Sequence, residues 1–185
     1  MNRCKWCNLK NKKYIDYHDK EWGRLNTSDN YLFEMLILEM NQAGLSWETV
    51  LNKRENFRKA YDNFNLDRVS NYDDKKIEEL LQNEGIIRNK RKIIASIKNA
   101  KIFKSIINDY GSFYDYLCTF TKGKTFIELD KTTNELSDQI SSDLKKRNMS
   151  FVGSTIIYSY LQAIGIIYSH EENCFLFKTN AFILK

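Results

Sequence analysis

The chain has 185 residues, of which 42% are hydrophobic and 14% aromatic, and its formal net charge is +5. This composition indicates a globular protein with a sizeable core and excludes a disordered chain. No apolar run approaches the roughly 18 residues that cross a bilayer, and the polar N-terminus lacks the apolar core of a signal peptide. We therefore expect no membrane contact and a cytoplasmic location. The mild positive charge permits nucleic-acid binding without requiring it.

Apolar residues recur three and four positions apart along most of the chain, the spacing of amphipathic helices. Helices are predicted over residues 31–40, 47–61, 73–85, 89–110, 136–144 and 156–166. The last of these is apolar on almost every side and is expected to lie at the centre. Residues 125–129 are the best candidate for a strand, and the aromatic stretch 6–22 is expected to be irregular. The prediction is an all-α fold forming a single domain over residues 1–185, with two helical lobes.

Both histidines lie near the chain ends, each with cysteine nearby. Cys4, Cys7 and His18 stand at one end, and His170 and Cys174 at the other. Thiolates and imidazoles in this number can saturate one tetrahedral zinc ion, which would join the two termini. The spacing of His170 and Cys174 places both on one face of a helical turn.

Alternatives to this zinc site remain open at this point. The spacing Cys4-x-x-Cys7 is also that of redox pairs, and Cys7 could replace one of the other ligands. The histidines and cysteines could also be ordinary polar and small hydrophobic residues.

The segment from Glu39 to Trp47 places one carboxylate on or beside the buried face of a strongly apolar helix. A buried carboxylate is costly unless it has a partner or a task. One interpretation is a glutamate that reaches the surface or pairs with a basic residue. The other is a pocket whose floor is Glu39 and whose walls are aromatic, drawn from Trp6, Tyr14, Tyr17, Trp22 and Trp47.

Residues 144–156 read as a basic helix end, a tight turn at Gly153 and a second helix beginning at Ser154 or Thr155. Free backbone N–H groups at a helix N-terminus can bind a phosphate. This order is typical of a helix-hairpin-helix DNA anchor, and equally of a common αα-hairpin in a helical bundle. Ser154 is expected to be the N-cap of the second helix.

These stretches together resemble the DNA-3-methyladenine glycosylase I family of bacterial alkylation-repair enzymes. The motifs that match run in order over nearly the whole chain. They include Arg3-Cys4-x-Trp6, Tyr14-Ile-x-Tyr17-His18-Asp19-x-Glu21-Trp22-Gly23, Gln42-Ala-Gly-Leu-Ser-Trp47, Phe151-Val-Gly153 and His170-x-x-x-Cys174. In the family, proline or threonine often follows the hairpin glycine, whereas this chain has Ser154. Residues 122–134 match little, so the resemblance implies nothing there.

The resemblance implies a helical fold of the helix-hairpin-helix glycosylase superfamily. It also implies a structural zinc ion, and that ion's ligands would be Cys4, His18, His170 and Cys174. Cys7 would then be a bystander. The implied substrate is double-stranded DNA containing alkylated adenine, bound by a monomer.

The resemblance further implies roles for the residues of the pocket and the DNA surface. Glu39 would hydrogen-bond the flipped base between Tyr17 and Trp47. Tyr14, Trp6 and Trp22 would line or support this pocket. Leu45 would be the wedge that enters the duplex, and Gly153, Ser154 and Thr155 would form the phosphate-binding hairpin.

The reaction implied is release of 3-methyladenine by hydrolysis of its glycosidic bond, without strand cleavage. The competing hypothesis is a non-enzymatic, zinc-stabilised helical DNA-binding module, which shares the basic residues and the hairpin. It leaves Glu39 among aromatic residues unexplained. A zinc hydrolase is disfavoured because four protein ligands saturate the metal and no HExxH pattern is present.

Overall fold

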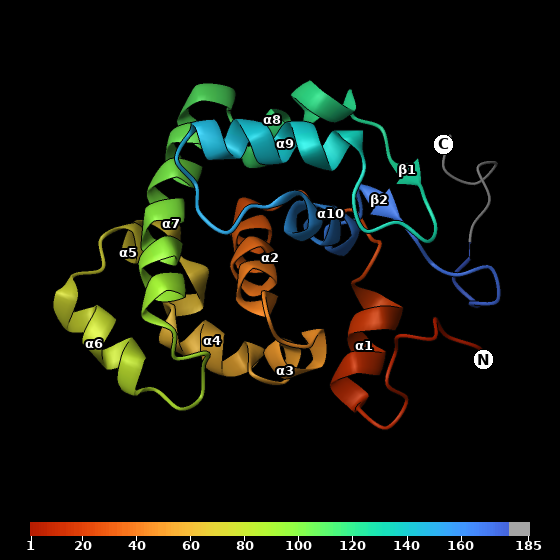
Figure 1. The fold of residues 1–185 in the computed structure, drawn as a ribbon, viewed down its shortest axis with the longest axis horizontal. Helices are drawn as coiled ribbons and strands as arrows, with labels where there is room; N and C mark the ends of the chain where they lie inside the picture. The colour runs from red at the N-terminus through yellow and green to blue at the C-terminus, as the bar shows by residue number, and fades with distance from the viewer. Residues whose placement is uncertain (178–185) are drawn as a thin grey trace.

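The computed structural model describes residues 1–177, and in this range the protein is all-α, as predicted (Figure 1). Its helices are α1 (Lys12–Lys20), α2 (Asp29–Gln42), α3 (Trp47–Asn52), α4 (Arg54–Ala60), α5 (Leu66–Ser70), α6 (Asp74–Gln82), α7 (Lys90–Tyr110), α8 (Phe113–Thr121), α9 (Glu135–Lys146) and α10 (Ser154–Ala163), with a 3-10 turn η1 (Asp62–Phe64). Two short strands, β1 (Phe126–Ile127) and β2 (Ile167–Tyr168), complete the fold. No helix in the described range is long and apolar enough to cross a membrane.

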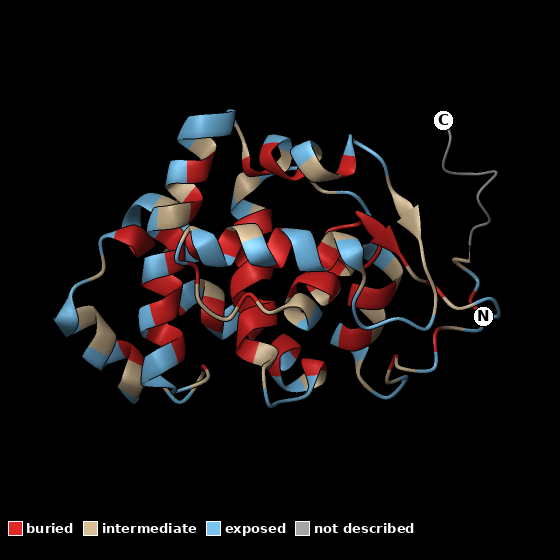
Figure 2. Ribbon diagram, turned by 45° about the horizontal axis from the view of Figure 1, so that its top comes forward, coloured by how far each residue is buried: buried red, intermediate tan, exposed pale blue. Residues whose placement is uncertain are grey.

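Helix α2 is the centre of the core. Its residues 32–41 are all buried, and it contacts α3, α7, α8 and α10. Figure 2 shows the buried residues concentrated on the central helices and on the inward faces of the outer ones. Burial over residues 32–41 excludes water from these side chains, including the carboxylate near the C-terminal end of the helix, Glu39.

One predicted helix and one predicted irregular stretch differ from the structure. The predicted helix over 47–61 is two helices, because the chain breaks at Lys53 between α3 and α4. The stretch 6–22 was expected to be irregular, and this is wrong for its second half, which forms α1. The Asn11 side chain caps this helix by accepting from Lys13 N–H. Tyr14, Tyr17 and His18 are three and four positions apart, so α1 brings them to neighbouring positions.

The end of α10 is fixed by a close approach of backbones. Gly165 has φ +82°, and a Cβ on it would lie 2.2 Å from the backbone of Arg24 and Leu25. Only glycine fits such a position. Nearby, Gly23 N–H donates to the Gln162 carbonyl at 3.1 Å. The segment after α1 is thereby held against the end of α10, beside the strand β2.

The predicted strand at 125–129 is present as the two residues of β1. It pairs in parallel with β2, with Phe126 opposite Ile167 and Ile127 opposite Tyr168. This pairing brings the loop after β1 to the same side of the molecule as the N-terminal segment and α1 (Figure 1). The two ends of the described range are also joined directly, since Phe175 N–H donates to the Asn2 carbonyl at 2.9 Å. The division of one domain into two lobes stays a prediction.

Candidate active site

A cavity of about 270 Å³ lies between α1, α2, α3 and the end of α10. All six residues predicted to form a pocket line it: Trp6, Tyr14, Tyr17, Trp22, Glu39 and Trp47. Its volume suits a small planar ligand that the aromatic walls would enclose. These residues come from four separate parts of the chain, so the cavity is a product of the tertiary fold.

The aromatic walls form two connected groups. Tyr17 from α1 and Trp47 at the start of α3 lie with ring centroids 5.2 Å apart. Trp6 contacts Trp22 edge-on at 4.7 Å and Tyr14 at 5.5 Å. Such packing holds ring faces in fixed positions, and an electron-rich ring face attracts a cation.

Glu39 is the one carboxylate of the central helix that lacks a partner. Its side chain is 4% exposed, and no hydrogen bond or ion pair to it is present among residues 1–177. Burial raises its pKa to about 8, so the carboxyl group holds its proton at neutral pH while the cavity is empty. The interpretation in which Glu39 reaches the surface or pairs with a basic residue is therefore wrong.

The other buried glutamate of α2 shows what a satisfied carboxylate looks like here. Glu34 accepts from Arg54 Nε at 2.6 Å and from Arg58 Nε at 2.8 Å. Arg54 also donates to Glu21, beside Trp22, at 2.7 Å. This ion-pair network joins α1, α2 and α4, and it lies outside the cavity.

Seven further residues that line the cavity escaped prediction. They are Gln42, Leu129, Asp130, Ser159, Gln162, Ser169 and Glu171. Leu129 and Asp130 belong to the segment 122–134, where the family resemblance implies nothing. Gln42 lay within a motif of the family resemblance, which was the only available signal for it.

The loop that bears Asp130 is anchored by Glu128. The carboxylate of Glu128 accepts from Tyr158 Oη at 3.1 Å and from Asn134 Nδ2 at 2.9 Å. The Asp130 side chain is exposed at the cavity rim and makes no hydrogen bond within the described residues. Two carboxylates, Asp130 and Glu171, thus line the cavity in addition to Glu39.

The residue predicted as a wedge stands on a short loop after α2. Helix α2 ends at Gln42, Gly44 adopts φ +80°, and the Leu45 side chain is 42% exposed. A second cavity, of about 240 Å³, lies between this loop and the start of α10. It shares Glu39, Gln42 and Ser159 with the first cavity, so the two spaces adjoin.

The turn from α9 to α10 has the predicted order of a helix, a tight turn and a second helix. Ser154 is not the N-cap, contrary to expectation. Gly153 is the N-cap, and the Ser154 hydroxyl instead bonds Ser137 and Asp138 of α9. A Cβ on Gly153 would meet nothing within 4 Å, and its φ is an ordinary −63°. The glycine therefore leaves open space in front of the uncapped N–H groups of Ser154, Thr155 and Ile156.

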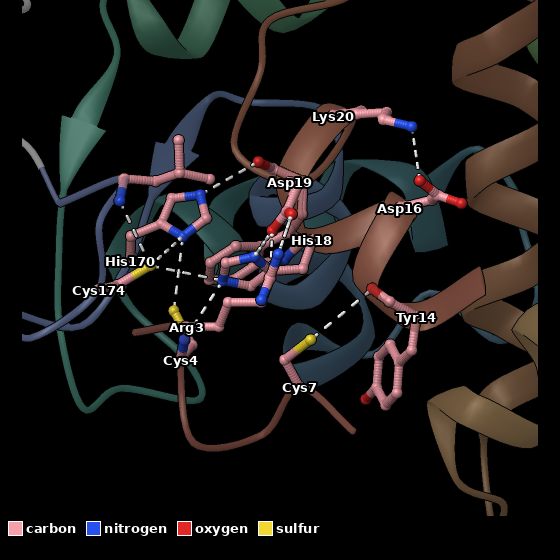
Figure 3. Close-up of polar contacts among 12 residues, drawn as sticks. Arg3, Cys4, Cys7, Tyr14, Asp16, His18, Asp19, Lys20, His170 and Cys174 are labelled. Atoms are coloured by element: carbon pink, nitrogen blue, oxygen red, sulfur yellow. Dashed lines mark hydrogen bonds and ion pairs between the residues drawn. The ribbon is translucent and has the colours of Figure 1, made fainter. Parts of the chain in front are cut away.

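The four residues predicted as metal ligands form one buried cluster (Figure 3). Their ligand atoms lie within 4.8 Å of one another, and each of the four residues is at most 5% exposed. Cys4 Sγ lies 3.4 Å from His170 Nδ1, and Cys174 Sγ lies 3.5 Å from His18 Nε2 and 3.6 Å from His170 Nδ1. His170 and Cys174 lie in a turn closed by Cys174 N–H on the Glu171 carbonyl, not in a helix.

The cluster fits a tetrahedral metal ion. Zinc bonds of about 2.3 Å to sulfur and 2.0–2.1 Å to nitrogen place the two atoms about 3.6 Å apart at a tetrahedral angle. The outer ring nitrogens are also occupied, since His18 Nδ1 bonds Asp19 at 2.7 Å and His170 Nε2 faces the Trp22 carbonyl at 3.3 Å. Such outer contacts fix ligand orientation around metals. Arg3 and His18 lower the pKa of Asp19 to about 2.

Cys7 lies outside the cluster. Its Sγ faces the Tyr14 carbonyl at 3.8 Å (Figure 3). Cys7 does not belong to the group of four residues whose ligand atoms lie within 4.8 Å of one another. The geometry therefore favours the ligand set without Cys7.

The cluster lies directly behind the wall of the cavity. The Trp22 ring contacts the His170 ring edge-on at 4.7 Å, and the Trp6 ring lies 5.2 Å from the His18 ring. Tyr17 and His18 are consecutive on α1, one lining the cavity and the other joining the cluster. Anything that holds the two imidazoles in place also holds two walls of the cavity.

Comparison with known proteins agrees with this geometry. A model of the methyladenine glycosylase family matches residues 6–177. The chain belongs to this family. The resemblance found in the sequence motifs is thereby confirmed, and the match includes both walls of the cavity and the hairpin.

Individual members of the methyladenine glycosylase family align over nearly their full lengths. DNA-3-methyladenine glycosylase 1 of Escherichia coli (strain K12) is 40% identical over 97% of this chain and 99% of its own. A crystal structure of 3-methyladenine DNA glycosylase I (TAG) matches with a TM-score of 0.91 at 41% identity, covering 96% of this chain and 100% of that one. A structure on 3-methyladenine recognition by the Staphylococcus aureus glycosylase matches with a TM-score of 0.88 at 29% identity, covering 94% and 96%.

Proposed function

We propose that this chain excises 3-methyladenine from alkylated double-stranded DNA by flipping the damaged nucleotide into the aromatic cavity. The carrying observation is Glu39, a buried carboxyl group without a partner at the floor of a cavity walled by Tyr17 and Trp47. The names of the family members that align over the whole chain point to the same substrate. A non-enzymatic DNA-binding module would have no need of such a carboxyl group.

Hydrolysis of this glycosidic bond requires little catalytic assistance from the protein. 3-Methyladenine carries a positive charge while it is attached to deoxyribose, and it is therefore a good leaving group. The bond from C1′ to the base breaks with its electron pair going to the base, which leaves neutral. Water supplies the hydroxyl group at C1′, and one proton is released. Flipping is easier for a damaged base pair, which contributes to selectivity.

The cavity stabilises the cationic base in two ways. The faces of Tyr17 and Trp47 attract it, a cation–π contribution of roughly 1–2 kcal/mol when desolvated. The arriving positive charge also favours the ionised form of Glu39, which gives up its proton as the base enters. The resulting carboxylate accepts from the exocyclic amine and stabilises positive charge that develops on the sugar.

The neighbouring surface would engage the duplex. Leu45 enters the gap left by the flipped nucleotide, next to the cavity that adjoins the base pocket. The uncapped start of α10, with Gly153, Ser154 and Thr155, receives a phosphate in the manner of a helix-hairpin-helix anchor. No lysine lines either cavity in the described part of the chain, which supports hydrolysis without strand cleavage.

We also propose that Cys4, His18, His170 and Cys174 hold one zinc ion. When bound, it supplies a fixed link between the two ends of the chain and has no open position for water. The ion would thereby position Trp22 and Trp6 through the two imidazoles. All residues of the proposed site come from one chain, so we propose a monomer as the active form.

The test is release of free base. The purified protein is incubated with methylated duplex DNA, and the released bases are separated by chromatography while the DNA is run on a denaturing gel. The expected result is free 3-methyladenine with intact strands bearing abasic sites. DNA binding without base release would support the non-enzymatic module instead.

A further inference from the structure

A groove on the surface of α7 stands apart from both cavities of the proposed site. It has a volume of about 510 Å³ and lies between α7 and the turn before α10. Arg91, Ile94, Ala95 and Lys98 form one side, and Ser150 and Phe151 form the other. We call it the α7 groove.

The two cations of the α7 groove have no carboxylate partner within the described residues. Arg91 and Lys98 are exposed, and neither forms an ion pair or a side-chain hydrogen bond within residues 1–177. No carboxylate lines the groove. Arg147, from the nearby basic end of α9, is by contrast paired with Asp143 at 2.7 Å. The groove therefore presents positive charge that the protein itself does not neutralise.

The floor between these cations is apolar. Ile94 is 46% exposed, and it lies between Arg91 and Lys98 on the exposed face of α7. Arg91 and Lys98 are seven positions apart, about 10 Å along the helix axis, which is far enough for the two side chains to contact different phosphates of one DNA strand. Alternating cationic and apolar contacts suit the phosphates and the sugars of a nucleic-acid backbone.

Two buried polar side chains of α7 hold the groove between the DNA-contacting elements. Lys92 Nζ donates to the carbonyls of Asn41 at 2.8 Å and Ala43 at 2.7 Å, at the foot of the loop that bears Leu45. Asn99 donates to the Ser150 carbonyl and accepts from its N–H, both at 2.9 Å. In Figure 1 the turn before α10 passes beside the middle of α7. One rigid helix thus fixes the spacing between the wedge loop and the hairpin.

We propose that the α7 groove binds the sugar–phosphate backbone of the duplex beside the flipped nucleotide, with Arg91 and Lys98 contacting phosphates. This inference rests on the proposed function, because it needs a duplex already engaged by Leu45 and the hairpin. The groove is continuous with the hairpin through Ser150, and its charge is complementary to the backbone. It contributes affinity and orientation and does not read the damaged base.

The experiment compares two double variants of equal charge. Arg91→Gln with Lys98→Gln removes the groove cations. Lys122→Gln with Lys124→Gln removes two exposed cations after α8, away from the groove. Binding to a duplex with an abasic-site analogue is measured over a range of salt concentrations. For the groove variant, the slope of log K against log salt is expected to fall by about 1.8, and the affinity at low salt by about tenfold or more.

Separate controls distinguish failure of this inference from failure of the proposed function. If the wild-type protein releases no 3-methyladenine, the proposed function is wrong. If it does release the base, an unchanged salt slope in the groove variant overturns the α7 groove. Ile94→Glu provides a second test, because a carboxylate in the groove should repel the backbone and raise KM more than it lowers kcat. Binding of free 3-methyladenine and thermal unfolding verify that the groove double variant and the Ile94→Glu variant are folded.

Discussion

The base cavity and the cysteine–histidine cluster share a wall, yet their polar groups are in opposite states. In the cluster, His18 and His170 each have one ring nitrogen facing sulfur and the other facing an oxygen acceptor. In the cavity, Glu39 has no partner, and Trp47 Nε1 is a buried donor without a hydrogen bond in the described range. Both sites are buried. The difference is that the protein provides contacts for the ring nitrogens of the cluster but, among the described residues, no hydrogen-bond partner for Glu39 or Trp47 Nε1 in the cavity.

This difference distinguishes a cluster with a structural role from a cavity that binds a ligand. A buried polar group without a partner is costly and is kept where a ligand supplies the missing contact. A cluster whose polar groups all have partners has no free donor or acceptor for a substrate. The same reasoning distinguishes Glu34, held by two arginines, from Glu39 on the same helix.

The largest effect is expected from Glu39→Gln. Glutamine fills the same space and retains an acceptor, but it cannot carry negative charge toward the sugar. Excision of 3-methyladenine in single-turnover assays should slow by about 10²-fold or more. An unchanged rate, with the fold intact, would remove Glu39 from the chemistry.

Loss of a cluster ligand should be felt first in stability. Cys174→Ser is expected to lose the proposed zinc ion and, with it, roughly 4 kcal/mol or more of unfolding free energy, because metal binding contributes directly to folding. Zinc content and thermal unfolding check this. The matched control is Cys7→Ser, which should keep one zinc per chain. Zinc lost equally from both variants would contradict the ligand set.

The comparison also shows what the sequence could predict. Glu39 stood out because it interrupts an apolar helical pattern, but that pattern left open whether its side chain is buried or reaches the surface. The ligand set needed the family resemblance, since spacing left Cys7 as an alternative. Trp6 and Trp22 could be assigned to the cavity but not positioned, because their packing against His18 and His170 depends on contacts between the two chain ends.

Leu45→Ala tests the opening of the cavity toward DNA. The Leu45 side chain is exposed, so its removal should leave the melting temperature nearly unchanged. Binding to duplex DNA with an abasic-site analogue should weaken about tenfold, equivalent to about 1.4 kcal/mol. Binding to the single strand should change little, since no stacked gap has to be filled there. Equal losses on both substrates would argue against a wedge.

The smallest effect is expected at the cavity rim. Asp130→Asn removes one negative charge near the entering cation, and a solvated charge of this kind is worth about 0.2–1 kcal/mol. The value of kcat/KM for 3-methyladenine excision should fall by about 1.4- to fivefold. Glu84→Gln, which removes an exposed charge after α6, serves as the control. A rim charge without influence would give the same kcat/KM in both variants.

The position of Asp130 at the cavity could not be predicted from the sequence. Its loop is positioned by a parallel pairing of two residues with two, between segments about 40 positions apart, and such short strands leave no periodicity to detect. Ser154 was assigned as an N-cap by residue preference, whereas the space in front of Gly153 and the contacts of Ser154 with α9 decide otherwise. Local patterns predicted α2, α6, α7, α9 and α10 but not α1, α5 or α8. Contacts between distant segments determined the site.

The state of Glu39 has a consequence for stability. The folded protein keeps a proton that the unfolded chain releases above its usual pKa of 4.5. The free energy of unfolding therefore falls as pH rises from 4.5 through about 8, by up to roughly 5 kcal/mol, and levels off above that range. This contribution to the pH dependence should be absent in Glu39→Gln.

The most direct test of an unpartnered carboxyl group is its own titration. Carbon-13 NMR of the labelled Glu39 carboxyl in the empty protein should give a midpoint near 8, the value that burial imposes. A cationic base analogue in the cavity should move this midpoint downward, because the ionised form then gains a partner. A midpoint near 4.5 in the empty protein would contradict the account, since Glu39 would then already be as well solvated or paired as an ordinary surface glutamate.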